Sequence, residues 1–169
     1  MRLRVNDMTH DYEHDHEREH EHDHERANHA HGHSHEHDHE QHHGYRETVE
    51  TNWGRIEMEA HVHDDAATVS MDAHPKEGCA VTISSLVDSM QRIAQAAEGT
   101  GGIVGHIKCF AQQGAESAHA SVTAADLAPT VEGDDSLSFG SMSTIQLVAI
   151  ILLISQDDLL AICKDAIAS

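Results

Sequence analysis

The sequence predicts an α+β domain: a small antiparallel or mixed sheet with two helices packed on one face, preceded by a disordered histidine-rich tail. Three observations support this prediction, namely a change in composition near residue 50, segments of alternating apolar residues, and two amphipathic helical patterns. Strands interrupted by two helices favour a layered α+β architecture. The 169 residues therefore divide into a predicted tail, 1–50, and a predicted domain, 51–169.

The predicted tail differs from the rest of the chain in composition. It contains fourteen of the nineteen histidines and fourteen carboxylates, with only scattered apolar residues. Such a segment buries too little apolar surface to offset the loss of chain entropy, which predicts disorder. Nearly all the Val, Ile, Leu and Ala follow it, enough for one core of ordinary size.

The predicted domain begins with a hairpin. Apolar and polar residues alternate over 56–62, and the alternation continues over 67–71, as in half-buried strands. Asp64-Asp65 stands between the two segments and keeps their apolar faces in register if it forms a two-residue turn.

A helix is predicted after this hairpin. Residues 80–83 are expected to form a short strand that leads into it. Ser85 and Asp88 resemble a capping box at its start, and Gly99 is placed to end it.

A second hairpin is predicted from 103–111 and 117–122. Ile103 is expected to point inward in the first of these strands, with His106 and Lys108 on the opposite, polar side. Matching the apolar faces of the two strands places Lys108 opposite His119, with His106 diagonal to it.

The last part of the chain is predicted as a loop, a strand and a helix. Residues 124–143 contain proline, glycine and several serines and are expected to be a surface loop. The apolar run 145–154 lacks a polar stripe and favours a fully buried strand. Ser155 and Asp158 resemble a second capping box, which starts the final helix.

The charge of the chain excludes some classes of partner. The formal net charge is −20 with histidine neutral, from 30 acidic and 10 basic residues. A nucleic-acid-binding protein normally displays a basic face, so we expect no nucleic-acid partner. Cations are the expected partners instead.

Localisation is predicted to be cytoplasmic. The first residues contain no apolar segment typical of a secretory signal, and the run 145–154 is too short to span a bilayer. Cys79, Cys109 and Cys163 have no CxxC spacing, so they predict neither a zinc ribbon nor a disulfide framework.

The histidines of the tail are interleaved with carboxylates. The motif EHDHE occurs at 13–17, 21–25 and 36–40. Imidazole is a good ligand for nickel, zinc and cobalt, whereas magnesium and calcium prefer oxygen ligands. The tract therefore predicts binding of divalent transition metals without one fixed geometry. Its candidate ligands are His14, His16, His20, His22, His24, His29, His31, His33, His35, His37, His39, His42 and His43.

The segment EAHVHDD, residues 59–65, contains a second candidate metal site. His61 and His63 are two apart on a predicted strand, so they share one face with Glu59, and Asp64 or Asp65 could complete the ligand set. An exposed polar strand face in an acidic, histidine-rich protein accounts for the same pattern, and both interpretations stay open.

An acidic histidine-rich block followed by GGIVGHIKCFA and AHASVTA resembles the region after the nucleotide-binding domain of CobW-like metal-chaperone GTPases. In that family a histidine-rich segment often precedes a small C-terminal α+β domain. The Walker motif of the GTPase half is absent from this sequence, so the resemblance implies no nucleotide hydrolysis. It implies a stand-alone module that works beside a separate GTPase or a metalloenzyme maturation protein.

Three functional hypotheses follow from the sequence. The first is a metal-binding accessory protein that stores nickel, zinc or cobalt or delivers it to such a partner. The second is a protein-interaction or homodimerisation module whose tail is a metal sink or a pH-responsive element. The third is a metalloenzyme using His61 and His63. No phosphate-binding loop, H-E-x-x-H or G-x-S-x-G motif accompanies these histidines, so we expect no enzyme activity.

Overall fold

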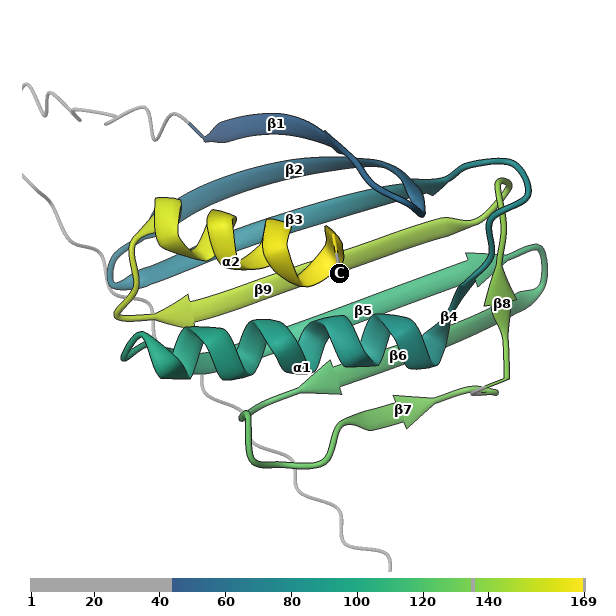
Figure 1. The fold of residues 1–169 in the computed structure, drawn as a ribbon. Helices are drawn as coiled ribbons and strands as arrows, with labels where there is room; N and C mark the ends of the chain where they lie inside the picture. The colour runs from purple at the N-terminus through teal and green to yellow at the C-terminus, as the bar shows by residue number, and fades with distance from the viewer. Residues whose placement is uncertain (1–43, 135, 169) are drawn as a thin grey trace, which may run out of the picture. The chain divides into compact units, whose positions relative to one another are not determined.

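A seven-stranded antiparallel sheet organises the described residues of the computed structural model, 44–134 and 136–168, and both helices lie on one of its faces (Figure 1). The predicted α+β class is confirmed. The predicted disordered segment up to residue 43 lies outside the described residues. The elements are β1 (Tyr45–Glu50), β2 (Gly54–His63), β3 (Ala66–Pro75), β4 (Val81–Thr82), α1 (Ile83–Gly99), β5 (Ile103–Gln113), β6 (Glu116–Val122), β7 (Thr130–Glu132), β8 (Ser138–Phe139), β9 (Thr144–Leu152) and α2 (Gln156–Ala168).

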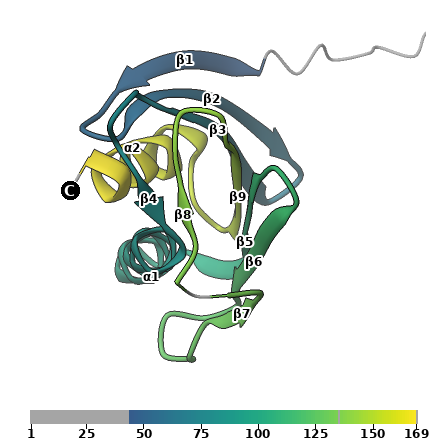
Figure 2. The same cartoon turned by 90° about the vertical axis from the view of Figure 1, so that its right-hand side faces the viewer.

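The last strand in the sequence lies at the centre of the sheet. The strand order is β1-β2-β3-β9-β5-β6-β7, so β9 pairs with β3 on one side and with β5 on the other. It joins the β1–β3 meander to the β5–β7 meander. Seen from the side, the sheet of the described domain curves around α1 and α2 (Figure 2). One sheet face is therefore covered by helices, and we call the opposite face the open face.

Strand β9 is half-buried, so the prediction of a fully buried strand was wrong. Ile145, Leu147 and Ala149 face the helices and are buried, whereas Gln146 and Ile150 lie on the open face and are exposed. The type of an apolar residue does not show whether it lies on the open face or in the core. The apolar run 145–154 therefore led to the prediction of a strand buried on both faces.

The N-cap of helix α1 lies three residues before the predicted one. Thr82 is the N-cap, with an extended backbone and a side-chain oxygen that accepts a hydrogen bond from Ser85 N at 3.1 Å. Ser85 therefore lies inside the first turn, and its hydroxyl donates to Thr82 O at 2.8 Å. The predicted Ser85–Asp88 capping box is wrong because the serine already belongs to the helix. The Ser155–Asp158 cap of α2 is confirmed, with Asp158 N donating to Ser155 Oγ at 3.1 Å.

Strand β5 contains an irregularity that reverses one predicted orientation. Its register with β9 shifts between Val104 and His106, at Gly105. Val104 consequently points into the core, whereas Ile103, predicted to point inward, is 54% exposed. A bulge inserts one extra residue, so the residues before it face the opposite side from the one that simple alternation predicts. The alternation of apolar residues in the sequence does not show where such a bulge lies.

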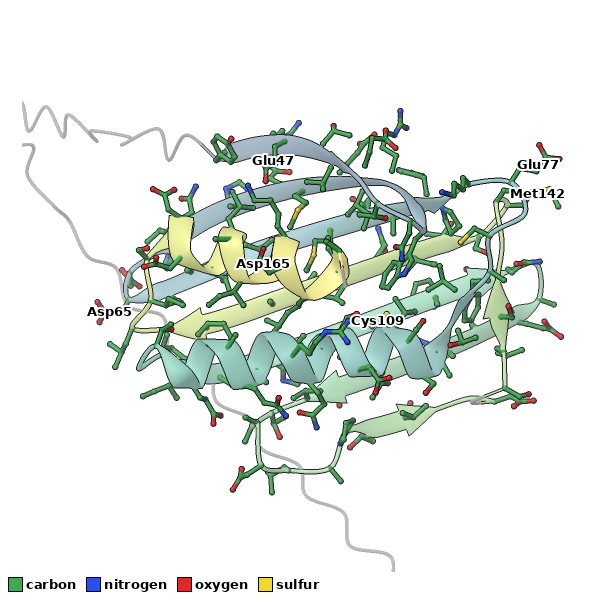
Figure 3. All side chains as sticks on the ribbon, viewed as in Figure 1. Glu47, Asp65, Glu77, Cys109, Met142 and Asp165 are labelled. Atoms are coloured by element: carbon green, nitrogen blue, oxygen red, sulfur yellow. The ribbon has the colours of Figure 1, made fainter. Side chains whose placement is uncertain are left out.

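Strand β1 lies within the segment that composition assigned to the tail. It pairs with β2 along its whole length, so the sheet begins at Tyr45, before the predicted boundary at residue 50. Its Glu47 faces α2 (Figure 3) and forms an ion pair with Lys164, with Nζ and Oε1 2.8 Å apart. The hydrogen bond from Lys164 to Glu47 raises the lysine pKa. This ion pair connects the edge strand β1 to the last helix, α2.

The predicted surface loop 124–143 contains two short strands. β7 extends the sheet at its second edge by pairing with β6. β8 pairs with β4, just before α1, and brings Phe139 into the core.

Candidate functional site

His61 lies on the open face near the end of β2. Its neighbours Ala60 and Val62 point to the other face, and Ala60 is fully buried there. Across the β2–β3 ladder His61 pairs with Thr68. Its side chain is 43% exposed, so solvent and ions have access to the imidazole.

One carboxylate joins His61 to the edge strand. Oε1 of Glu59 lies 3.0 Å from His61 Nε2 and 2.9 Å from Arg46 Nη2. The hydrogen bond from Arg46 is the main cause of the lowered pKa of Glu59, and His61 adds to it. Glu59 is therefore ionised at neutral pH. A neutral His61 that donates from Nε2 to this carboxylate keeps its free lone pair on Nδ1.

Gly44 lies directly against the His61 ring. A Cβ atom at residue 44 would lie 2.6 Å from His61 Nδ1, closer than real side chains approach. A side chain at residue 44 would therefore displace the imidazole from this position. Gly44 is the first described residue, and it lies beside Nδ1 of His61.

His63 is more exposed and contacts a different carboxylate. Its Nδ1 lies 3.0 Å from Asp64 Oδ2, and the two side chains are 85% and 88% exposed. The β2–β3 register pairs His63 with Ala66, which confirms the predicted two-residue Asp64-Asp65 turn. Asp64 adopts a left-handed backbone with φ of 53°, a conformation that aspartate tolerates better than most residues. Asp65 marks this turn in Figure 3.

The described residues do not bring together a complete metal site. Within 44–134 and 136–168, no three His, Cys, Asp or Glu side chains are grouped so that they could hold a metal ion. His61 and His63 contact Glu59 and Asp64 respectively, rather than a common carboxylate. The predicted ligands from His14 to His43 lie outside the described residues. Metal binding by the tract and by this strand therefore stays a prediction.

The second hairpin has a register different from the predicted one. Phe110 lies opposite His119, and Lys108 lies opposite Ser121. The apolar faces also match in this register, because shifting a strand by two residues preserves its faces. The Phe110 and His119 rings are in contact, with centroids 4.8 Å apart and an interplanar angle of 44°.

A shallow cleft of about 450 Å³ lies on the open face around this ring pair. It is lined by His106, Lys108, Glu132 and Gln146 in addition to the two rings. Nε2 of His106 is buried and has no hydrogen-bond partner in the described residues. The cleft thus combines an aromatic wall with both signs of charge.

Sequence reasoning missed the contributions of Gly44 and Arg46. Both lie in the segment assigned to the tail, where a lone glycine and an arginine gave no signal. The β1–β2 register, which pairs Arg46 with Glu59, places them beside the predicted histidine strand. Alternation in the short segment 45–50 was the available signal, since Arg46 and Thr48 flank Glu47 on the opposite face.

The cysteines are free, and two of them belong to the core. Cys109 and Cys163 are buried, and burial raises the pKa of each thiol to about 12. Cys109 lies in the sheet beneath the helices (Figure 3). These thiols fill the core and offer no surface ligand.

No helix among the described residues is long and apolar enough to cross a membrane. No family model, curated protein or solved structure matches the chain. The resemblance to CobW-like proteins accordingly stays a prediction.

Proposed function

We propose that this protein is an accessory protein of the cytoplasm that binds nickel, zinc or cobalt for storage or for delivery to a partner. The observation that supports this most is the density of histidine and carboxylate ligands before residue 44, with fourteen histidines in that segment. The exposed His61 and His63 of β2 add two further imidazoles to the proposal.

The chemistry of the tract favours transfer over tight retention. Alternate histidines can share an ion in several equivalent ways, so each ion has neighbouring ligands to exchange with. Only the neutral imidazole binds a metal, so protons compete with the ion as the pH falls through about 6.5, the ordinary histidine pKa. A protein that loads and releases ions near neutral pH fits these properties.

The folded domain is the proposed docking module. Its partner class is a separate GTPase or a metalloenzyme maturation protein, to which the tail would hand its ion. The open face is the face of the sheet available for such docking, because α1 and α2 cover the other one. No catalytic role is proposed for the domain.

A second candidate function rests on the apolar residues of the open face. Ile150 and Leu152 are both 37% exposed, and Leu153 is 63% exposed. Val148, Ile150 and Leu152 form an apolar stripe along β9 in the middle of a polar sheet face, and Leu153 follows directly after the strand. A homodimer or another protein interface would bury this stripe, and the tail would then be a metal sink or a pH-responsive element.

Native mass spectrometry and calorimetry on full-length protein test the leading proposal. A variant with the fourteen tail histidines replaced by glutamine is compared with the wild type during nickel or zinc titration at pH 7.5. We expect the wild type to bind several ions and the variant to lose most of them. A variant with His74, His106 and His119 replaced by glutamine is the control and should bind as the wild type does.

The outcomes separate the candidate functions. Equal metal loading of the tail variant and the wild type, or no loading of either, would overturn the metal-storage proposal. A dimer of the metal-free wild type that an Ile150→Lys substitution dissociates would favour the interaction module.

A further inference from the structure

The open-face cleft on β5, β6 and β7 contains two unpaired side chains of opposite charge. Lys108 and Glu132 both line it, and neither forms an ion pair with another described residue. The other two Lys or Arg side chains of the described open face differ in this respect, because Arg46 and Arg55 each contact a carboxylate of β2. Lys108 therefore lacks a carboxylate partner in a chain that is rich in carboxylates.

The register of the sheet holds these two charges apart, on either side of β6. Lys108 lies opposite Ser121 of β6, whereas Glu132 lies opposite His119, on the other side of the same strand. Neighbouring strands are about 4.8 Å apart, so the backbones of β5 and β7 are separated by about 10 Å. The two long side chains can reach a common ligand between them, but they do not contact each other.

An aromatic pair lies next to these charges. Phe110 follows Lys108 on the same face of β5, and its ring contacts that of His119 at 4.8 Å between centroids and 44° between planes. A third planar ring can pack against this pair at the separations of about 4.5 to 7 Å that aromatic rings prefer. The cleft volume of about 450 Å³ lies within the range of about 300 to 1,000 Å³ that is typical of small-molecule sites.

We propose that this cleft binds an aromatic α-amino acid, with its carboxylate on Lys108, its ammonium group on Glu132 and its ring against the aromatic pair. A zwitterion suits the cleft better than an anion, because a chain with a formal charge of −20 repels anionic ligands. It also pairs with both unpaired charges at once, which a cation or an anion alone would not do. The site contains none of the proposed metal ligands, so the inference goes beyond the proposed function.

A further polar group lies at the lysine end of the cleft. His106 precedes Lys108 by two residues on the same face of β5, and its Nε2 is buried without a hydrogen-bond partner in the described part of the chain. Buried polar atoms are hydrogen-bonded in most native structures, so this nitrogen has unused capacity beside the expected position of the carboxylate. It favours a ligand whose polar end, rather than its ring, lies toward Lys108.

Ligand titrations of the full-length protein by two-dimensional ¹H–¹⁵N NMR at pH 7.5, with a chelator present, test the inference. L-Tryptophan should shift the amide signals of residues 106–110, 119–121 and 130–132. The expected dissociation constant is about 0.1 to 1 mM, because a shallow cleft covers only part of the ligand. Tryptamine lacks the carboxylate, indole-3-propionate lacks the ammonium group and glycine lacks the ring. Each of these compounds should bind about tenfold more weakly than tryptophan.

Single substitutions in the full chain assign each charge to one group of the ligand. Lys108→Met should no longer prefer tryptophan to tryptamine, and Glu132→Gln should no longer prefer tryptophan to indole-3-propionate. Arg55→Met and Glu57→Gln are the matched controls, because they remove an open-face cation and carboxylate outside the cleft. Both should bind tryptophan as the wild type does, and dispersed spectra of every variant show that it is folded.

Three results would overturn the inference. The first is the absence of shifts in the cleft residues up to the solubility limit of tryptophan. The second is equal binding of all four compounds by the wild type. The third is an unchanged preference for tryptophan in both Lys108→Met and Glu132→Gln. Because the chelator removes free metal ions, these results are independent of metal binding by the protein.

Discussion

Glu59 connects the edge strand to the candidate site through a single oxygen atom. Arg46 from β1 and His61 from β2 both approach its Oε1, at 2.9 and 3.0 Å. The lowered pKa of this carboxyl keeps it charged through the neutral range. The same residue therefore contacts both the imidazole of His61 and the first part of β1.

The three cysteines should differ sharply in reactivity. The thiolate is the nucleophile, and a pKa of about 12 leaves almost none of it at Cys109 and Cys163 near pH 8. Cys79 lies in a partly exposed loop. Iodoacetamide labelling of the native protein at pH 8, read by peptide mass spectrometry, should modify Cys79 alone, while all three react in denaturant. Native labelling of Cys109 at the rate of Cys79 would contradict its burial.

The same buried thiols set an alkaline limit to stability. Their folded pKa is raised above the ordinary value near 9, so the stability that their neutral form provides is complete below about pH 9. It declines as the pH rises toward 12, because only the unfolded chain can ionise. The loss approaches about 1.4 kcal/mol per pH unit for each thiol in that window.

At the scale of elements, α1 shows how local signals compete. Thr82 and Ser85 are both good capping residues, and the chain uses the earlier one, because Thr82 has the extended backbone of a cap at the end of β4. Asp88 is then an ordinary helical residue. The position of β4 therefore determines which of the two residues, Thr82 or Ser85, is the N-cap of α1.

Replacing Thr82 should therefore destabilise the protein, whereas replacing Asp88 should not. Thr82→Ala removes the acceptor for Ser85 N and should lower the free energy of unfolding by about 1 kcal/mol, measured by urea denaturation. Asp88→Ala is the matched control and should change it by less than about 0.5 kcal/mol. A larger loss for Asp88→Ala than for Thr82→Ala would favour the predicted capping box over the observed cap.

Most helices and strands of this fold can be predicted from the sequence. The order of the strands in the sheet and the register between them are harder to predict. Alternation located the strands of both hairpins, and Asp64-Asp65 fixed the register of the first one. The second hairpin was misplaced by two residues, because a shift of two leaves every side chain on the same face. The insertion of β9 between β3 and β5 depends on contacts far apart in the chain, which no local pattern contains.

The candidate site was predictable only in part for the same reason. His61, Glu59 and the turn beside His63 are neighbours in the sequence, so their common face follows from strand alternation. Arg46 and Gly44 reach the site through pairing between β1 and β2. Composition assigned their segment to the tail, so their positions beside Glu59 and His61 became visible only when the strand register was known.

At the scale of the whole molecule, charge should make stability depend on salt. The chain has 30 acidic and 10 basic residues and a formal charge of −20, so self-repulsion opposes the compact state. Raising ionic strength shortens the screening length from about 30 Å at 0.01 M to about 3 Å at 1 M. The few ion pairs of the described surface, such as Arg55 with Glu57 at 3.2 Å, are weakened by the same screening but contribute little.

We therefore expect the melting temperature to rise with potassium chloride. At pH 8, where ordinary histidines are neutral, a change from 0.01 to 1 M should stabilise the protein by about 1 kcal/mol, or about 4 °C. Circular dichroism melts in the presence of a chelator measure this change without a metal contribution. Sucrose is the uncharged control. Replacing several acidic residues of the open face, such as Glu57 and Asp72, by their amides should reduce the salt dependence. A melting temperature that falls with salt would show that attractive ion pairs, rather than net repulsion, dominate the electrostatics of this fold.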